Sequence, residues 1–192
     1  MKTTLKYLKE FLRHPSRTGA VAASSRGLAR LIVETAGVRD AGVIVEFGPG
    51  AGVFTERIRH EMPEGACFFA VEASEPFARE AARHCPDVPV YHDCATNSGR
   101  YLSAHGHDRC DCVVSGLPWA AFDGALQDRL IATILEILRP GGRFVTFAYV
   151  HGAFLPAGAA FRRKLQANFR RVEKTRTVWR NLPPAFVYSA ER

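Results

Sequence analysis

The alternation of apolar and polar stretches along the chain predicts strands and helices in turn. Short apolar runs rich in β-branched residues are typical of buried parallel strands, and helices show apolar residues three and four positions apart. Strands are expected at residues 43–45, 67–71, 90–92, 110–114 and 144–148, with a final hairpin at 172–179 and 184–189. Helices are expected at 1–14, 25–36, 53–60, 75–84, 96–103, 123–138 and 154–169. This order predicts an α/β fold, with a seven-stranded, mostly parallel sheet covered by helices on both faces.

The first 14 residues show the clearest amphipathic pattern, with an apolar row, a basic row one position on, and Pro15 at its end. Two interpretations stand: a helix packed on the domain with a solvated charged face, or a helix lying in an anionic membrane surface. In the second, the membrane-binding residues are Lys2, Leu5, Lys6, Leu8, Lys9, Leu12 and Arg13. We expect residues 1–25 to form this helix and a linker, and residues 26–192 to form one domain.

Three glycines at alternate positions follow the first predicted strand. Gly48, Gly50 and Gly52 lie between that strand and the next helix. A strand, a glycine turn and a helix present backbone N–H groups to a ligand at the helix N-terminus. A dinucleotide-binding fingerprint would need a glycine where this chain has Val53. The alternative is a tight turn that binds no ligand.

The acidic residue before the turn indicates which ligand suits it. The pattern Glu46-x-Gly-x-Gly-x-Gly52 resembles motif I of class I S-adenosylmethionine (SAM)-dependent methyltransferases. SAM carries an ammonium and a sulfonium group, so a carboxylate suits its site. Leu138-Arg-Pro-Gly-Gly142 before the fifth strand also resembles these enzymes. The resemblance implies a Rossmann-like SAM-dependent methyltransferase domain over residues 26–192.

In doubly wound sheets the ligand lies beyond the carboxyl ends of the strands. By the resemblance, Glu72 binds the ribose hydroxyls, Asp93 binds the adenine amino group, and Ser115 and Leu117 lie near the methyl donor. For Asp93 the alternative is a turn acid that caps the next helix. The full expected set of cofactor-binding residues is Thr18, Glu46, Gly48, Gly50, Gly52, Glu72, Ala73, Asp93, Cys94, Ser115 and Leu117.

The segment Ser115-Gly-Leu-Pro-Trp119 follows the fourth predicted strand. N6-adenine and exocyclic amine methyltransferases carry Asn/Asp-Pro/Leu-Pro-Tyr/Phe at this place, where the first side chain accepts hydrogen bonds from the target amine. This chain keeps Leu-Pro-aromatic but has Ser-Gly ahead of it. An amine target is therefore favoured, and a flipped base held by that Asn is not.

Charge is unevenly distributed along the chain, although the net charge is +7. Lys and Arg outnumber acids by 8 to 3 in residues 1–40 and by 9 to 2 in residues 151–192, whereas residues 41–150 hold 9 against 14. An acidic centre suits a cationic cofactor, and the two basic ends are expected to meet something anionic. With no stretch of about 20 apolar residues and no signal-peptide pattern, we expect a cytoplasmic protein.

The five cysteines contain no C-x-x-C pair, and we expect free thiols and no metal. Cys110 and Cys112 are expected on the same face of a strand. The alternative is a zinc site that also uses His105 and His107, but the ligand spacing is wrong for it.

Nearly the whole chain is similar to one family, the soluble bacterial phospholipid N-methyltransferases. The resemblance rests on the basic first helix, Arg17-Thr-Gly-Ala-Val-Ala-Ala-Ser-Ser25, Glu46-Phe-Gly-Pro-Gly-Ala-Gly-Val-Phe-Thr55, Ser115-Gly-Leu-Pro118 and Val178-Trp-Arg-Asn-Leu-Pro-Pro-Ala-Phe186. It implies stepwise methylation of phosphatidylethanolamine to phosphatidylcholine, with S-adenosylhomocysteine (SAH) as the other product. It also implies an enzyme that is peripheral on the inner face of the cytoplasmic membrane, and no nucleic-acid partner.

A neutral amine must be aligned with the methyl group, so the ethanolamine ammonium has to lose a proton first. Alternation after the fifth strand places Tyr149 and His151 on the same side, where His151 takes the proton or binds the lipid phosphate. The expected catalytic residues are Tyr149, His151 and Tyr101. The expected substrate-binding residues are Tyr7, Trp119, Tyr149, His151 and Arg180, through aromatic contacts with the cation and a pairing of Arg180 with the phosphodiester.

Two other functions fit parts of the pattern. An RNA N6-adenine dimethyltransferase also uses a Glu-x-Gly-Pro-Gly turn, but Ser115 in place of Asn and the absence of a separate RNA-binding domain disfavour it. A protein that only binds SAM or anionic lipid is the third interpretation. The intact Glu46, Glu72 and glycines argue against it.

Overall fold

The computed structural model describes residues 24–192. The expected first helix, Tyr7 and Thr18 lie outside the described residues. Within residues 24–192 the chain forms a seven-stranded sheet in the order β3-β2-β1-β4-β5-β7-β6. Its strands are β1 (Val43–Phe47), β2 (Cys67–Glu72), β3 (Val90–His92), β4 (Cys110–Ser115), β5 (Leu138–Tyr149), β6 (Arg171–Lys174) and β7 (Ala185–Glu191). The pairs among β1 to β5 are parallel, and β6 and β7 form the predicted antiparallel pair; β7 is also antiparallel to β5.

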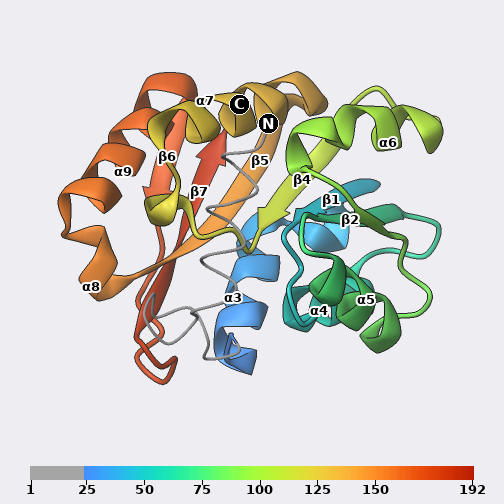
Figure 1. Ribbon diagram of the computed structural model, residues 1–192, viewed down its shortest axis with the longest axis horizontal. Coiled ribbons are helices and arrows are strands. Elements are labelled where there is room, and N and C mark those ends of the chain that lie inside the picture. The colour runs from blue at the N-terminus through green and yellow to red at the C-terminus, as the bar shows by residue number, and fades with distance from the viewer. Residues whose placement is uncertain (1–23) are drawn as a thin grey trace.

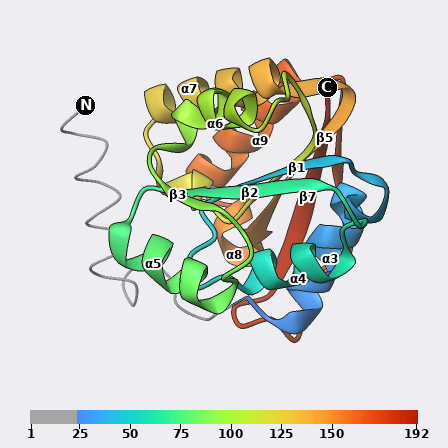
Figure 2. The same ribbon diagram turned by 90° about the vertical axis from the view of Figure 1, so that its right-hand side faces the viewer.

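Helices cover both faces of the sheet. They are α3 (Arg26–Ala36), α4 (Val53–Glu61), α5 (Glu75–His84), α6 (Ser98–Ala104), α7 (Gly124–Ile137), α8 (Val150–Ala153) and α9 (Pro156–Asn168). Figure 2 shows α6, α7 and α9 on one side of the sheet and α3, α4 and α5 on the other. Alternation along β1 serves both layers, because Val45 packs into the cluster with α7 and α9 and Ile44 into the cluster with α3 and α4.

Side-chain caps fix the ends of two helices where the sequence predicted them. The Ser25 hydroxyl accepts a hydrogen bond from the Leu28 amide at 3.2 Å, and Gly37 ends α3 in the left-handed region with φ of 72°. Asp123 accepts from the Leu126 amide at 2.7 Å and begins α7. None of the helices within residues 24–192 is both long and apolar enough to cross a bilayer.

The region after β5 differs from the prediction. The helix expected at 154–169 begins only at Pro156, whose ring suits the first helical position, and the short α8 precedes it. The strand expected at 172–179 ends at Lys174, and residues 175–184 form a loop in which Val178 alone bridges Ala185. We call residues 175–184 the β6–β7 loop.

A register shift separates Cys110 from Cys112. Cys110 pairs with Leu138 and Cys112 pairs with Arg143, so the predicted Pro-Gly-Gly turn bulges out between them. As a result the two thiols pack into different hydrophobic clusters, on opposite layers. The prediction that they share a face was wrong, because simple alternation holds only along an unbroken ladder.

Candidate active site

The glycine turn joins β1 to α4. Gly48, Gly50 and Gly52 have φ of 69°, 55° and 89°, which side chains rarely tolerate. Gly48 and Gly50 differ in how much space a side chain would have. An added Cβ at Gly48 would lie 2.6 Å from Leu117 Cδ2, whereas at Gly50 it would have no neighbour within 4 Å among the described residues. Gly48 is therefore a packing position, and Gly50 forms an open part of the turn where a ligand can approach the backbone.

Glu46 is fully buried directly before this turn. Its Oε2 accepts a hydrogen bond from Thr55 Oγ1 at 2.7 Å, while its Oε1 has no hydrogen-bond partner among the residues that the structure describes. Burial raises the pKa of Glu46 to about 8, and the nearby charge of Glu72 adds to the rise. A buried carboxylate oxygen that lacks a partner is suited to a cationic ligand, which would also favour its ionised form.

Glu72 ends β2 and holds the glycine turn in place. Its Oε2 accepts from the Gly50 amide at 3.2 Å and its Oε1 accepts from the Ser74 amide at 2.9 Å. Burial raises its pKa, although these amides and that of Ala73 oppose the rise. The structure thus brings Glu72, Ala73 and the turn together, as the sequence predicted; the ribose contact stays a prediction.

Asp93, at the end of β3, is engaged by its own segment. It accepts hydrogen bonds from the Cys94 amide at 2.8 Å, Asn97 Nδ2 at 2.9 Å and Tyr101 Oη at 3.0 Å, and pairs with Arg100 at 2.7 Å. Burial opposes the fall, but these donors hold the pKa of Asp93 below its usual range. This local arrangement resembles the turn acid of the alternative interpretation, and an adenine contact for Asp93 and Cys94 stays a prediction.

Tyr101 does not join the other expected catalytic residues. Its ring stacks on Tyr91 at 3.9 Å and its hydroxyl donates to Asp93. The strand that carries Asp93 lies four positions from β5 in the sheet order, which is about 19 Å at the usual strand spacing. The expected grouping of Tyr101 with Tyr149 and His151 is therefore wrong, because topology places β3 at the edge of the sheet.

Ser115 is a structural residue of the loop after β4. It is fully buried, and its Oγ accepts from the Leu117 amide at 3.2 Å and from Trp119 Nε1 at 3.0 Å. Its carbonyl accepts from Thr146 Oγ1 at 3.1 Å. The side chain therefore holds the loop together, and its place near the methyl donor stays a prediction.

Trp119 belongs to the core. Its side chain stacks on Phe161 at 4.9 Å and contacts the edge of Phe144, and only 3% of the residue is exposed. The predicted contact with a substrate cation is wrong. The indole N–H is satisfied by Ser115, so the ring can be buried without an unpaired donor.

We expect Ser115→Ala to lower the free energy of unfolding by about 3 kcal/mol, because two buried N–H donors lose their acceptor. Urea denaturation followed by tryptophan fluorescence measures this loss. Ser103→Ala, on the exposed surface of α6, is the matched control and should change stability little. Equal stability of the two variants would contradict the structural role of Ser115.

The loop after β4 touches the glycine turn through Gly116. A Cβ at Gly116 would lie 2.4 Å from the carbonyl oxygen of Gly48. A side chain directly before Leu117 is thereby excluded in this conformation. Leu117 itself is half-buried against Gly48, and its place near the methyl donor stays a prediction. This contact was not predicted, and the only signal for it was the glycine itself.

An aromatic row links the start of α4 to α8. Phe54 contacts Phe147 edge-on at 5.8 Å, Phe147 contacts Tyr149 at 5.4 Å, and Tyr149 stacks on His151 at 5.8 Å between ring centroids. Tyr149 and His151 therefore meet as predicted, although His151 lies in α8 and not on a continued strand. Burial raises the pKa of Tyr149. Sequence reasoning missed Phe54 and Phe147, although Phe147 alternates with Tyr149 along β5.

Arg180 is exposed in the β6–β7 loop. This loop leads into β7 at Ala185, which pairs with Tyr149 at the carboxyl end of β5. The loop therefore lies at the same end of the strands as Tyr149. The phosphodiester contact of Arg180 stays a prediction.

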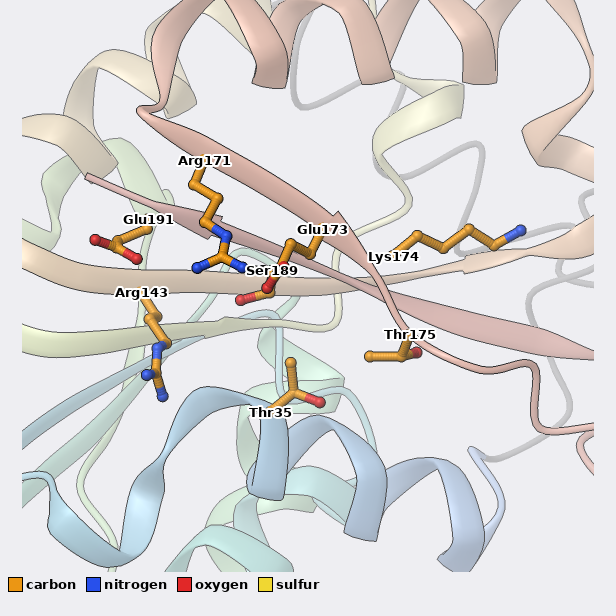
Figure 3. A pocket seen from close by; sticks show the side chains of 8 residues that line it. All are labelled: Thr35, Arg143, Arg171, Glu173, Lys174, Thr175, Ser189 and Glu191. Atoms are coloured by element: carbon orange, nitrogen blue, oxygen red, sulfur yellow. Dashed lines mark hydrogen bonds and ion pairs between the residues drawn. The ribbon is translucent and has the colours of Figure 1, made fainter.

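A hollow of about 340 Å³, lined by neither Tyr149 nor His151, lies between α3 and the strands β5, β6 and β7 (Figure 3). Thr35, Arg143, Arg171, Glu173, Lys174, Thr175, Ser189 and Glu191 line it. Arg171 and Glu173 pair at 2.6 Å, so much of the lining charge is already compensated. Within residues 24–192 no three His, Cys, Asp or Glu side chains cluster as metal ligands, and the five cysteines are free thiols. The zinc alternative thus has no described ligand set.

The chain was compared with known proteins and solved structures. No family model matches the chain. An ornithine lipid N-methyltransferase of Singulisphaera acidiphila is 28% identical over 192 residues, covering 88% of this chain and 100% of the relative. Among solved structures, an O-methyltransferase from Bacillus cereus in complex with SAH has a TM-score of 0.70 at 18% identity, covering 97% of this chain and 91% of that chain. The O-methyltransferase TomG of Streptomyces achromogenes in complex with SAM has a TM-score of 0.68 at 18% identity, covering 97% and 89%.

This chain has the class I SAM-dependent methyltransferase fold. The fold predicted from the sequence is confirmed. The carboxyl ends of the central strands carry the glycine turn, Glu46 and Glu72. Doubly wound sheets hold their ligands at this end of the strands.

Proposed function

We propose that this protein is a SAM-dependent N-methyltransferase that acts on the amino group of a membrane lipid. The observation that carries the proposal is the buried Glu46 carboxylate beneath a turn of three glycines, with one oxygen that has no partner within residues 24–192. The fold is that of enzymes solved with SAM and SAH, and a relative that aligns over its whole length is named as a lipid N-methyltransferase.

The residues of the turn fit SAM. Glu46 matches its positive charge, Gly50 leaves the backbone open to close approach, and Glu72 supplies carboxylate oxygens beside the turn. When bound, SAM supplies a methyl group on a positively charged sulfur. Because nothing in such a ligand resembles a phosphate, the acidic surroundings favour it over a dinucleotide.

The aromatic row supports an amine substrate. A lipid ammonium has a lysine-like pKa and must be deprotonated before it accepts a methyl group. His151 is exposed at the edge of the sheet and in its neutral form can take that proton. Tyr149 and Phe147 offer ring faces and edges next to it, which suit an increasingly methylated cation.

We infer phosphatidylethanolamine and its mono- and dimethyl derivatives as substrates, with phosphatidylcholine and SAH as products. The relative's name adds ornithine lipid as a second amino lipid to test. On this proposal the enzyme works as a peripheral protein on the inner face of the cytoplasmic membrane. The basic segment 151–192 supports an anionic lipid surface as the partner.

The deciding experiment offers methyl-labelled SAM with three acceptors to the full-length protein. These are phosphatidylglycerol vesicles with phosphatidylethanolamine, the same vesicles with ornithine lipid, and unmodified ribosomal RNA. We expect label in phosphatidylethanolamine and its methylated forms. Label only in ornithine lipid would move the substrate to that lipid, label only in RNA would favour the RNA dimethyltransferase, and label in none would favour a protein that only binds.

A further inference from the structure

Four large apolar side chains are exposed on two neighbouring loops. Phe154 and Leu155, between α8 and α9, are 81% and 57% exposed. Trp179 and Leu182, in the β6–β7 loop, are 72% and 73% exposed. We call these four residues the apolar rim. Water-exposed side chains of this size are unfavourable unless a partner covers them, so a cluster of them indicates a contact surface.

The apolar rim lies at the carboxyl end of β5, where Tyr149 and His151 are found. Tyr149 pairs with Ala185, and the Val150 amide donates to the Pro184 carbonyl at 2.9 Å, which ties the start of α8 to the end of the β6–β7 loop. Figures 1 and 2 both show α8 and this loop at the same end of the molecule. A partner on the apolar rim would therefore face the proposed amine site.

The β6–β7 loop is held in place by a buried asparagine. Asn181 is 1% exposed; its Oδ1 accepts from the Ser25 amide at 2.9 Å, and its Nδ2 donates to the Pro183 carbonyl at 2.6 Å. The Val178 amide also donates to the Ala185 carbonyl at 2.7 Å. With Asn181 anchored inside, the neighbouring Trp179 and Leu182 remain outside. The loop presents these side chains from a defined backbone.

The charged side chains of the β6–β7 loop and of α9 are all positive, and Glu34 of α3 is an acidic side chain within electrostatic reach of Arg176. The β6–β7 loop contains Arg176 and Arg180 and no acidic residue, and both arginines are exposed. Arg162 and Arg163 are exposed on α9, which follows Phe154 and Leu155. Exposed apolar side chains beside arginines complement an anionic bilayer, with the rings and leucines at the acyl boundary and the guanidinium groups among the headgroups.

We propose that the apolar rim inserts into the interface of an anionic phospholipid bilayer and turns the Tyr149–His151 edge toward the lipid headgroups. This inference rests on the proposed function and adds a docking surface within the folded domain to it. The residues of this surface are different from those of the predicted first helix. Because insertion needs neither SAM nor methyl transfer, it can be tested independently of the activity.

The two tryptophans of the chain provide the probe, since Trp179 is exposed and Trp119 is buried. The full-length protein is mixed with phosphatidylglycerol vesicles, with and without brominated acyl chains, and its fluorescence is compared with that of Trp179→Phe. We expect the emission that Trp179 contributes to shift to shorter wavelength and to be quenched by the bromines. The Trp179→Phe variant, which reports Trp119 alone, should show neither change.

Two outcomes would overturn the docking surface. One is a Trp179 emission that vesicles leave unchanged although the protein sediments with them, because another segment would then make the contact or cover the apolar rim. The other is no sedimentation with anionic vesicles. Trp179 insertion without methyl transfer to any lipid would overturn the proposed function alone, and methyl transfer without insertion would overturn the docking surface alone.

A second variant measures the contribution of the remaining residues. Phe154→Ser combined with Leu182→Ser should lower the vesicle partition coefficient by about tenfold or more, because two large apolar side chains no longer leave water. Gln166→Ser, an exposed polar position on α9, is the matched control. An unchanged partition coefficient in the double variant would contradict insertion of these residues.

Discussion

Glu46→Gln is expected to weaken SAM binding by about 100-fold, because the variant keeps the shape of the side chain but loses its charge. The bond from Thr55 survives, since the amide oxygen can accept it. Titration calorimetry of the two proteins with SAM and SAH measures the loss. Glu56→Gln, at an exposed position on α4, is the control and should bind normally. Equal affinities of the Glu46 variant and the wild type would remove Glu46 from the cofactor site.

The same substitution should change how stability depends on pH. The pKa of Glu46 is about 8 in the folded, ligand-free protein, compared with 4.5 for the free side chain. Between these values the folded state holds a proton that the unfolded state has lost. The free energy of unfolding therefore falls by about 1.4 kcal/mol per pH unit as pH rises through this window. It levels off above pH 8, where both states are ionised.

Glu46→Gln lacks this contribution and should be more stable than the wild type at pH 9, in the absence of SAM. Urea denaturation at pH 5, 7 and 9 tests the difference between the two proteins. In the wild type, SAM affinity should rise between pH 7 and 9 as Glu46 ionises, and it should not do so in the variant. Parallel stability curves for the two proteins would show that Glu46 titrates normally.

Gly116→Ala is expected to abolish SAM binding and to lower the free energy of unfolding by about 2 kcal/mol or more. The added methyl group would stand 2.4 Å from the Gly48 carbonyl oxygen, and a backbone atom cannot move aside as a side chain can. The loop after β4 and the glycine turn would have to separate. Calorimetry with SAM and thermal unfolding measure the two effects.

Gly152→Ala is the matched control for this second prediction. Gly152 lies in α8, and an added Cβ there would have no described neighbour within 4 Å. Alanine in a helix also costs less backbone entropy than glycine, so this variant should be equally stable or slightly more stable. A Gly116→Ala protein that binds SAM like the control would show that the contact with Gly48 is not needed.

Local signals carried the sequence-based prediction a long way. The glycine turn and the caps at Ser25, Gly37 and Asp123 depend on residues close together in the chain, and all were found in place. The strands β1, β2 and β4 were also predicted closely, because a buried parallel strand has to be apolar on both faces. The cofactor-binding residues expected at the ends of β1 and β2 were predicted from the same local pattern.

Residue roles that depend on distant partners were predicted less well. Trp119 was predicted to contact the substrate because it follows a motif, but Phe161 stacks on it from an element far along the chain. Tyr101 was separated from Tyr149 by the order of the strands. A local sequence pattern does not predict which residues will be buried by an element that lies far along the chain.

The sequence by itself determined the α/β order, the glycine turn with its acid, and the chemical preference for a cationic ligand, because each arises from neighbours within a few residues. Only the tertiary structure decided that Glu46 is buried with one oxygen unpartnered among the described residues, that Gly116 must touch Gly48, and that the apolar rim lies beside Tyr149. Burial and contact depend on segments that meet through the sheet, and strand order is a property of the whole chain.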